Sequence, residues 1–290
     1  MLLGLALVTL VMSPPPFSSL DRTAGASGAG ADVAVQQFDD SNSDGGIVDD
    51  DRALRIDLHG EYPLSSTFGV TASLPAMWSD VHGDQQTGLG AMHLGGYGRL
   101  RLADGHDLFF RAGVQLPTET YVPDGTYVDE VMMHAFAFQR LEDPSLSSGA
   151  FWLRGGASYR LRLGDLAAQL DYLVDLPVGG DLEAEGPRSP DGFWARVVFA
   201  GGVAYAPGPW AVAGELVAAG FPYLDIPADL GPAPDVLEAT FDEQVSTVAT
   251  LSARWDADPL VLSLWFSTPL DDDLRDHDVN VLGVGARSSF

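Results

Sequence analysis

Apolar and polar residues alternate with a period of two along most of the chain, from residue 52 onwards. In the block Leu54–Tyr62, Leu54, Ile56 and Leu58 share one face, whereas Arg55 and Asp57 share the other. This period is the signature of β-strands that are buried on one face only. Ten further blocks repeat it: 68–74, 92–102, 108–116, 151–163, 166–174, 197–205, 210–218, 247–255, 260–266 and 278–290. With Asp32–Phe38 (DVAVQQF) as another candidate, the pattern predicts about twelve strands.

The connections between these blocks alternate between short and long. Short ones fall at 63–66, 103–106, 164–165, 206–209 and 256–259, and long ones near 79–87, 118–149, 178–191, 222–243 and 270–277. Tight turns at one end and long polar loops at the other are typical of a transmembrane β-barrel. Such closure also leaves no strand edge unpaired. We therefore expect an all-β fold, an antiparallel transmembrane barrel of about twelve strands.

The distribution of arginine indicates which face of the strands points outwards. Ten of the fifteen Arg lie on the polar faces of the strands, while acidic residues concentrate in the connections. A membrane barrel turns its apolar face to lipid and fills its lumen with polar groups. The alternative is a soluble antiparallel sandwich or lipocalin-like barrel with the apolar face inside.

On the membrane interpretation, charged and polar side chains of the inward face are candidates to line a pore. These are Arg55, Asp57, Glu61, His93, Arg99, Arg101, Arg111, Arg154, Arg160, Arg162, Asp171, Asp175, Arg196, Glu215, Arg254 and Arg287. Arg rings favour anions in a pore. A structural reading is that Arg99, Arg101, Arg160 and Arg162 pair across strands with the acidic members of the set, because buried charges require partners.

Composition narrows the function classes further. The chain has 290 residues, 41 acidic against 15 basic ones, a net charge of −26, no cysteine and no lysine. So acidic a chain repels phosphate backbones, which argues against nucleic-acid partners. The absence of cysteine excludes thiolate zinc sites and cysteine nucleophiles. No cofactor-binding motif occurs, so we expect no cofactor and no metal site built from protein ligands.

The first residues have the character of an export signal. Met1–Met12 is apolar but too short to span a bilayer as a helix. Ala29-Gly30-Ala31 is a candidate cleavage site, and Ala24-Gly25-Ala26 is another. The expected organisation is a signal peptide over 1–31 and a barrel over 32–290, in which 118–149 is a long loop.

Several segments carry a family resemblance. Gly88-Leu89-Gly90, Tyr97-Gly98-Arg99-Leu100 and Leu116-Pro117-Thr118 resemble motifs of the outer-membrane family described as the MetA pathway of phenol degradation, or as putative transporters. Ala91 and Glu119 depart from that pattern, in which Asp and Gly are common. The final strand ends in Phe290, which is similar to the aromatic ending of Gram-negative outer-membrane barrels. The resemblance implies transport and recognition of the last strand by the barrel-assembly machinery, but it indicates no substrate.

Candidate catalytic chemistry is sparse. His93 is the best lumen-side candidate for a Ser–His pair, but the alternation directs it away from lipid. The run Asp271-Asp272-Asp273 with His277 has the composition of a protease site or of a calcium site, as have the aspartates at 39–40 and 49–51, although a solvated acidic loop is the simpler reading. We therefore expect no enzymatic activity.

The segment 118–149 contains an apolar stretch, 131–138, which fits either a constriction folded into the lumen or an additional strand pair. Taken together, the sequence predicts an outer-membrane barrel of a Gram-negative bacterium that serves as a passive channel or transporter for small solutes. Its partners would be the lipid bilayer and those solutes. The alternative is a non-conducting structural or surface-interaction barrel with a plugged lumen.

Overall fold

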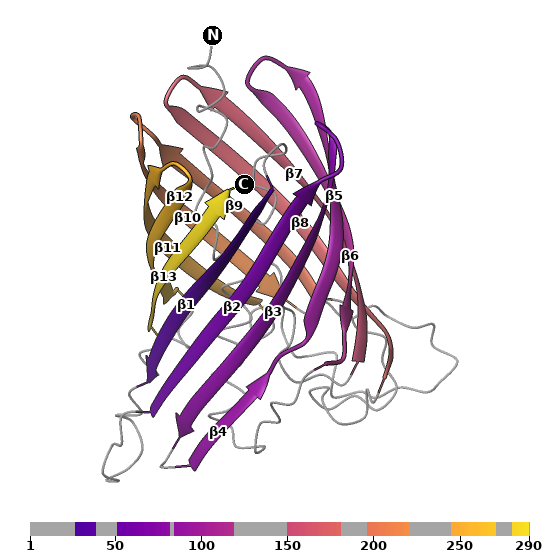
Figure 1. Ribbon diagram of the computed structural model, residues 1–290, viewed down its shortest axis with the longest axis vertical. Coiled ribbons are helices and arrows are strands. Elements are labelled where there is room, and N and C mark those ends of the chain that lie inside the picture. The colour runs from indigo at the N-terminus through magenta and orange to yellow at the C-terminus, as the bar shows by residue number, and fades with distance from the viewer. Residues whose placement is uncertain are drawn as a thin grey trace.

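The computed structural model describes residues 27–38, 51–81, 84–118, 150–180, 196–220, 245–270 and 280–289. They form one antiparallel sheet that closes into a barrel of tilted strands (Figure 1). The strands are β1 (Gly28–Phe38), β2 (Asp51–Pro63), β3 (Phe68–Val81), β4 (Asp84–Leu89), β5 (Met92–Ala103), β6 (His106–Leu116), β7 (Ala150–Leu163), β8 (Leu166–Gly180), β9 (Arg196–Tyr205), β10 (Trp210–Gly220), β11 (Val245–Ala257), β12 (Leu260–Pro269) and β13 (Asn280–Ser289). The pairing of β1 with β13 closes the ring. No helix in this part of the chain is long and apolar enough to cross a membrane.

Strands β4 and β5 occupy a single position in the wall. Ala76–Val81 of β3 pairs with β4, and Phe68–Ser73 of β3 pairs with β5. The barrel therefore has twelve strand positions, as predicted. The predicted long loop near 79–87 is wrong, because β3 and β4 continue through it as a two-stranded ribbon. The segment Asp84–Leu89 is mostly polar, so its sequence carries no alternating apolar pattern that would reveal a strand.

The two ends of the barrel differ. The connections β2–β3, β5–β6, β7–β8, β9–β10 and β11–β12 are short and lie at one end, called here the turn end. Gly105 and Gly164 have φ of 78° and 63° in two of these turns, a conformation that glycine adopts without strain. The opposite end, the loop end, carries the long connections, most of which fall outside the described residues. In outer-membrane barrels the short turns face the periplasm.

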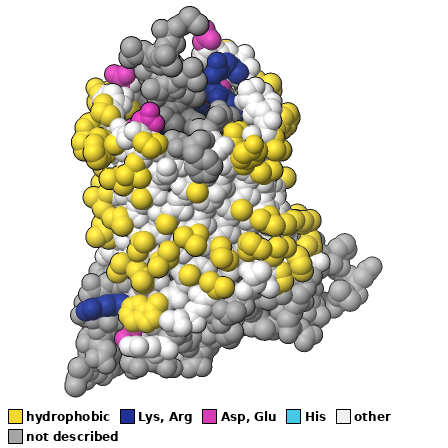
Figure 2. All heavy atoms as spheres, viewed as in Figure 1, with side chains coloured by type: hydrophobic (Ala, Val, Ile, Leu, Met, Phe, Trp, Pro, Cys, Tyr) yellow, Lys and Arg dark blue, Asp and Glu magenta, His cyan; other side chains and the backbone are white. Residues whose placement is uncertain are grey.

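Side chains alternate between a buried inner face and an exposed outer face along every long strand. On β11, Thr250 is 2% exposed whereas the adjacent Leu251 is 69% exposed. Many large apolar residues, mostly Leu, Val, Phe, Tyr and Trp, are exposed, whereas the buried set contains Arg, Asp, Glu and His. Figure 2 shows hydrophobic side chains spread over the wall of the barrel on the face in view. This arrangement is the reverse of a soluble barrel, so the sandwich or lipocalin-like alternative is wrong.

Aromatic residues mark the outer surface near the turn end. Tyr62, Tyr205, Trp210 and Trp255 are all exposed there, and the rings of Trp210 and Trp255 stack with centroids 5.8 Å apart. Tyr and Trp prefer the membrane–water interface because each combines an apolar ring with a polar group. These four residues fit an interfacial girdle. Phe221 and Phe290 lie outside the described residues.

Strand β1 starts before the predicted end of the signal peptide. Gly28–Ala31 pair with both β2 and β13. Cleavage after Ala31 would remove these residues from the wall, whereas cleavage after Ala26 would leave the strand whole. The boundary of the exported chain remains a prediction, and strand β1 favours the earlier of the two candidate sites.

Close packing on the inner wall depends on a glycine near the closing seam. Trp265 of β12 lies opposite Gly283 of β13, and a Cβ atom at Gly283 would overlap the indole ring. We expect Gly283→Val to lower the free energy of unfolding by ~1–3 kcal/mol, the usual cost of overpacking. Urea unfolding of the barrel refolded into lipid vesicles measures this change.

The matched control is Gly155→Ala in β7, where an added Cβ would meet no atom within 4 Å. That substitution should leave the unfolding midpoint nearly unchanged. Equal losses for Gly283→Val and Gly155→Ala would contradict the packing of Trp265 on Gly283.

Candidate functional site

The polar side chains predicted from sequence lie on the inner wall of the barrel, where they are largely buried. Fifteen of the sixteen have described side chains. Their low exposed fractions, or their contacts with buried residues, place them on the inner wall. Arg101 differs from the others because its side chain, at the turn end, is 60% exposed. Arg196 stands opposite Asp175 in the register of β8 and β9, but its side chain lies outside the described residues. A role in lining an open pore stays a prediction.

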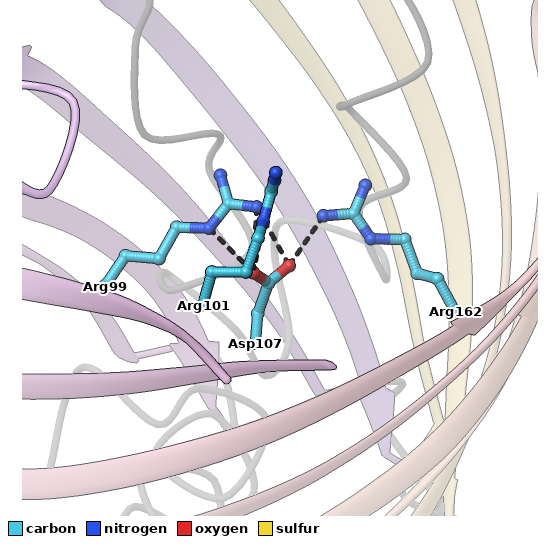
Figure 3. Close-up of polar contacts among 4 residues, drawn as sticks. All are labelled: Arg99, Arg101, Asp107 and Arg162. Atoms are coloured by element: carbon cyan, nitrogen blue, oxygen red, sulfur yellow. Dashed lines mark hydrogen bonds and ion pairs between the residues drawn. The ribbon is translucent and has the colours of Figure 1, made fainter. Parts of the chain in front are cut away.

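Asp107 organises the largest cluster of arginines (Figure 3). It is the second residue of β6, which pairs with β5 on one side and with β7 on the other. Strand β5 carries Arg99 and Arg101, and β7 carries Arg160 and Arg162. The Nη2 atoms of Arg99 and Arg162 donate to Oδ2 of Asp107 at 2.9 and 2.7 Å, and Nε of Arg101 lies 3.5 Å from Oδ1. Asp107 is 1% exposed. The sequence analysis missed Asp107 because it stands next to a short turn, outside the alternating block that begins at Leu108.

A second group of charges lies further along β6, β7 and β8. Nε of Arg154 donates to Oδ1 of Asp175 at 2.6 Å, across neighbouring strands. Asp171 accepts hydrogen bonds from Ser158 and from Nε2 of Gln169. These contacts satisfy carboxylates that would otherwise be costly to bury. Polar contacts on the inner face therefore help to hold β7 and β8 together.

Charged pairs also line the wall near the closing seam. Nε of Arg55 donates to Asp57 of the same strand at 2.6 Å. Nη2 of Arg287 lies 3.5 Å from Glu61, and Nδ1 of His59 lies 3.1 Å from Asp32. Asp32 and His59 were not among the predicted site residues, because their interaction depends on the pairing of β1 with β2 rather than on any local motif. Arg99, Arg101 and Arg162 do pair with a carboxylate across strands, but that carboxylate is Asp107, which was not among the expected partners.

The inner wall has an apolar side as well. Leu173, Val198, Val217 and Val248 point inwards from β8, β9, β10 and β11 and are 3% exposed or less. In the sheet register Leu173 lies opposite Val198, and Val217 lies opposite Val248. The sequence pattern missed this side, because apolar residues occupy both faces of these strands. The inner wall thus carries most of its charged side chains on β2 and β5–β8, and these apolar side chains on β8–β11, where Glu215 and Arg254 also lie inside.

The aromatic ring of Phe109 connects two arginines of the charged wall. The guanidinium carbon of Arg160 lies 4.6 Å from the centre of the ring, and that of Arg99 lies 5.8 Å away. Cations favour the face of an aromatic ring, particularly where water is excluded. Phe109 is 1% exposed, so it gives Arg99 and Arg160 a fixed surface on which to rest.

The sequence analysis named His93 and the acidic segments as candidates for catalysis or metal binding. Among the described residues, no group of three or more His, Asp or Glu could hold a metal ion. His93 borders a small hollow with Thr71, Tyr97, Arg111 and Arg154, in which Thr71 and Tyr97 supply the hydroxyl groups. The acidic segments 39–40, 49–51 and 271–277 lie outside the described residues, except for Asp51 at the start of β2, whose side chain is not described. A calcium site there therefore stays a hypothesis.

Comparisons with known proteins agree with the fold. No family model matches the chain, and no curated protein matches it. An outer membrane channel from Pseudomonas putida F1 is 14% identical, with a TM-score of 0.55, over 91% of this chain and 96% of that one. NanC porin is 10% identical, with a TM-score of 0.50, over 90% and 100% of the two chains. KdgM porin, in a structure with disordered oligogalacturonate, is 9% identical, with a TM-score of 0.50, over 90% and 99%.

At these identities the likeness establishes the fold alone. The chain adopts the antiparallel barrel of Gram-negative outer-membrane proteins, in agreement with the predicted fold and with the predicted location in the outer membrane. The resemblance to the MetA-pathway family has no support from a family model and stays a prediction.

Proposed function

We propose that this barrel is a passive outer-membrane channel for small polar solutes. The observation that carries the proposal is the reversal of polarity across its wall, with apolar residues outside and ionised residues inside. A wall of guanidinium and carboxylate groups in a lipid-embedded barrel suits a hydrated path. The channel and porin descriptions of proteins with a similar fold support the same function.

The proposal does not require catalytic groups, a cofactor or a resident metal. We propose a non-enzymatic role, because no nucleophile, base and oxyanion donor are brought together among the described residues. Insertion by the barrel-assembly machinery through the strand that ends in Phe290 is part of the proposal, and it rests on the aromatic ending of the sequence.

A second candidate is a structural barrel that does not conduct. It is favoured by the tight burial of inner side chains such as Trp152, Leu173 and Val198, each 1% exposed or less. In a barrel of this size, paired side chains can fill much of the interior. The acidic connections at the loop end would then be the working surface, exposed to the medium outside the cell.

Single-channel recording of the refolded protein in a planar bilayer separates the two candidates. We expect discrete current steps, because the charged wall retains water around its ions. A salt gradient across the bilayer gives the sign of the ion preference through the reversal potential. Insertion is checked separately by heat-modifiable migration on gels. Inserted barrels that give no current would contradict the channel and support the structural barrel.

A further inference from the structure

Asp107 is in contact with more arginines than a structural ion pair requires. Elsewhere on the inner wall, Arg55 binds Asp57 and Arg154 binds Asp175 as pairs of one arginine with one carboxylate. At Asp107 three guanidiniums from two strands converge on a single carboxylate (Figure 3). Three positive charges against one negative charge leave an excess of positive charge at the turn end of the lumen.

The three arginines also keep hydrogen-bond donors that Asp107 does not use. Each guanidinium has five N–H groups in a planar fork. Arg99 uses Nε and Nη2 on Asp107, and Arg162 uses Nη2. Arg101 lies 3.5 Å away, beyond a strong hydrogen bond, and its side chain is 60% exposed. Its guanidinium can therefore reach a solute without giving up a bond within the protein.

The surroundings hold this cluster in place and do not cancel its charge. Asp107 and Phe109 are both 1% exposed, and Phe109 supports Arg99 from beneath. Arg160 stands directly opposite Asp107 in the register and adds a fourth cation nearby. The nearest turns carry Asp104 and Asp165, but among the described residues neither forms an ion pair with these arginines.

We infer that Arg99, Arg101 and Arg162 form a binding site for a small oxyanion, carried as a carboxylate or phosphate by the solute. Planar guanidiniums bind both groups through paired, charge-assisted hydrogen bonds. Asp107 sets the positions of the arginines, and Arg101 is the member whose side chain is accessible to a solute. The inference deepens the proposed channel function, because it names anionic small molecules as the class of solute favoured at the turn end.

Binding can be measured apart from conduction. Isothermal titration of the detergent-refolded barrel at low salt would use citrate as one probe and inorganic phosphate as the other. We expect at least one probe to bind, and Arg101→Glu to weaken that binding by at least about tenfold, because the substitution reverses a charge at the site. Arg101→Lys should retain more of the affinity than Arg101→Glu, since it keeps the charge but loses the planar fork.

The matched control is Arg52→Glu, which makes the same change of charge on an exposed arginine at the loop end. Its affinity should stay within about twofold of the wild type, because Arg52 lies at the opposite end of the barrel from the Asp107 cluster and Coulomb interactions weaken with distance. Gel migration verifies that every variant folds. No binding of either probe, or equal losses in Arg52→Glu and Arg101→Glu, would overturn the inference. The barrel could also bind a probe, lose that binding in Arg101→Glu, and yet carry no current. That result would support the inference and refute the channel.

Discussion

Replacing Asp175 with alanine is expected to destabilise the barrel by ~3–5 kcal/mol, because a buried charge then loses its partner. The side chains of Arg154 and Asp175 are 1% and 0% exposed and their closest atoms are 2.6 Å apart. Removing the carboxylate leaves the guanidinium of Arg154 inside the wall without that bond. The unfolding free energy in urea, measured with the protein in lipid vesicles, gives the size of the loss.

Two further variants separate burial from charge pairing as such. Asp256→Ala also breaks an ion pair, with Arg254 at 2.5 Å, but the Asp256 side chain is 35% exposed at the turn end. Arg254 is itself only 6% exposed, but water can reach the site of the missing Asp256 carboxylate, so we expect a smaller cost than for Asp175→Ala. The double variant Arg154→Met with Asp175→Leu should regain most of the stability lost in Asp175→Ala. A double variant no more stable than Asp175→Ala would show that packing, rather than the unpaired charge, dominates.

The second large effect concerns the outer surface. Leu251 lies at the middle of β11 and is 69% exposed, so in a membrane it faces the acyl chains. We expect Leu251→Arg to cost ~2–4 kcal/mol, the usual penalty for arginine on the lipid face at the bilayer midplane. The same vesicle-based unfolding experiment measures it.

Leu163 provides the control for depth. It is 66% exposed and ends β7 at the turn end, beside the positive-φ glycine Gly164. Leu163→Arg should cost no more than ~1 kcal/mol, because the arginine can reach the interface and water. Equal costs for Leu251→Arg and Leu163→Arg would contradict the placement of β11 across the membrane.

The alternating pattern was sufficient for most of the wall. The block Leu54–Tyr62 lies within β2, Asp51–Pro63, and the candidate strand Asp32–Phe38 lies within β1, Gly28–Phe38. The strands could be predicted because one face of each strand meets lipid and the other faces the lumen. Apolar and polar residues therefore alternate along the strand. Strand β4, which pairs with the end of β3, is mostly polar and lacks this alternation, so the sequence pattern did not predict it.

The inner wall was harder to predict than the outer one. Sequence placed Arg99, Arg101 and Arg162 on the inward face, and the structure agrees. It could not supply their partner, because Asp107 meets them only through the register of β5, β6 and β7. Register is a property of neighbouring strands, whereas alternation is a property of one strand. The apolar side formed by Val198, Val217 and Val248 was missed for a related reason, since apolar residues on both faces erase the period.

The seam between β1 and β13 has a consequence for how the barrel assembles. Gly28 pairs with Ser289, so the contact that completes the wall joins residues about as far apart along the chain as the fold allows. Loop-closure entropy must be overcome before that contact contributes any stabilisation, and contacts between distant residues slow folding. Until β13 arrives, β1 and β12 each expose a row of unsatisfied backbone groups, which lipid cannot solvate. Pairing of the last strand therefore completes the barrel, and we expect the barrel to fold as one cooperative unit.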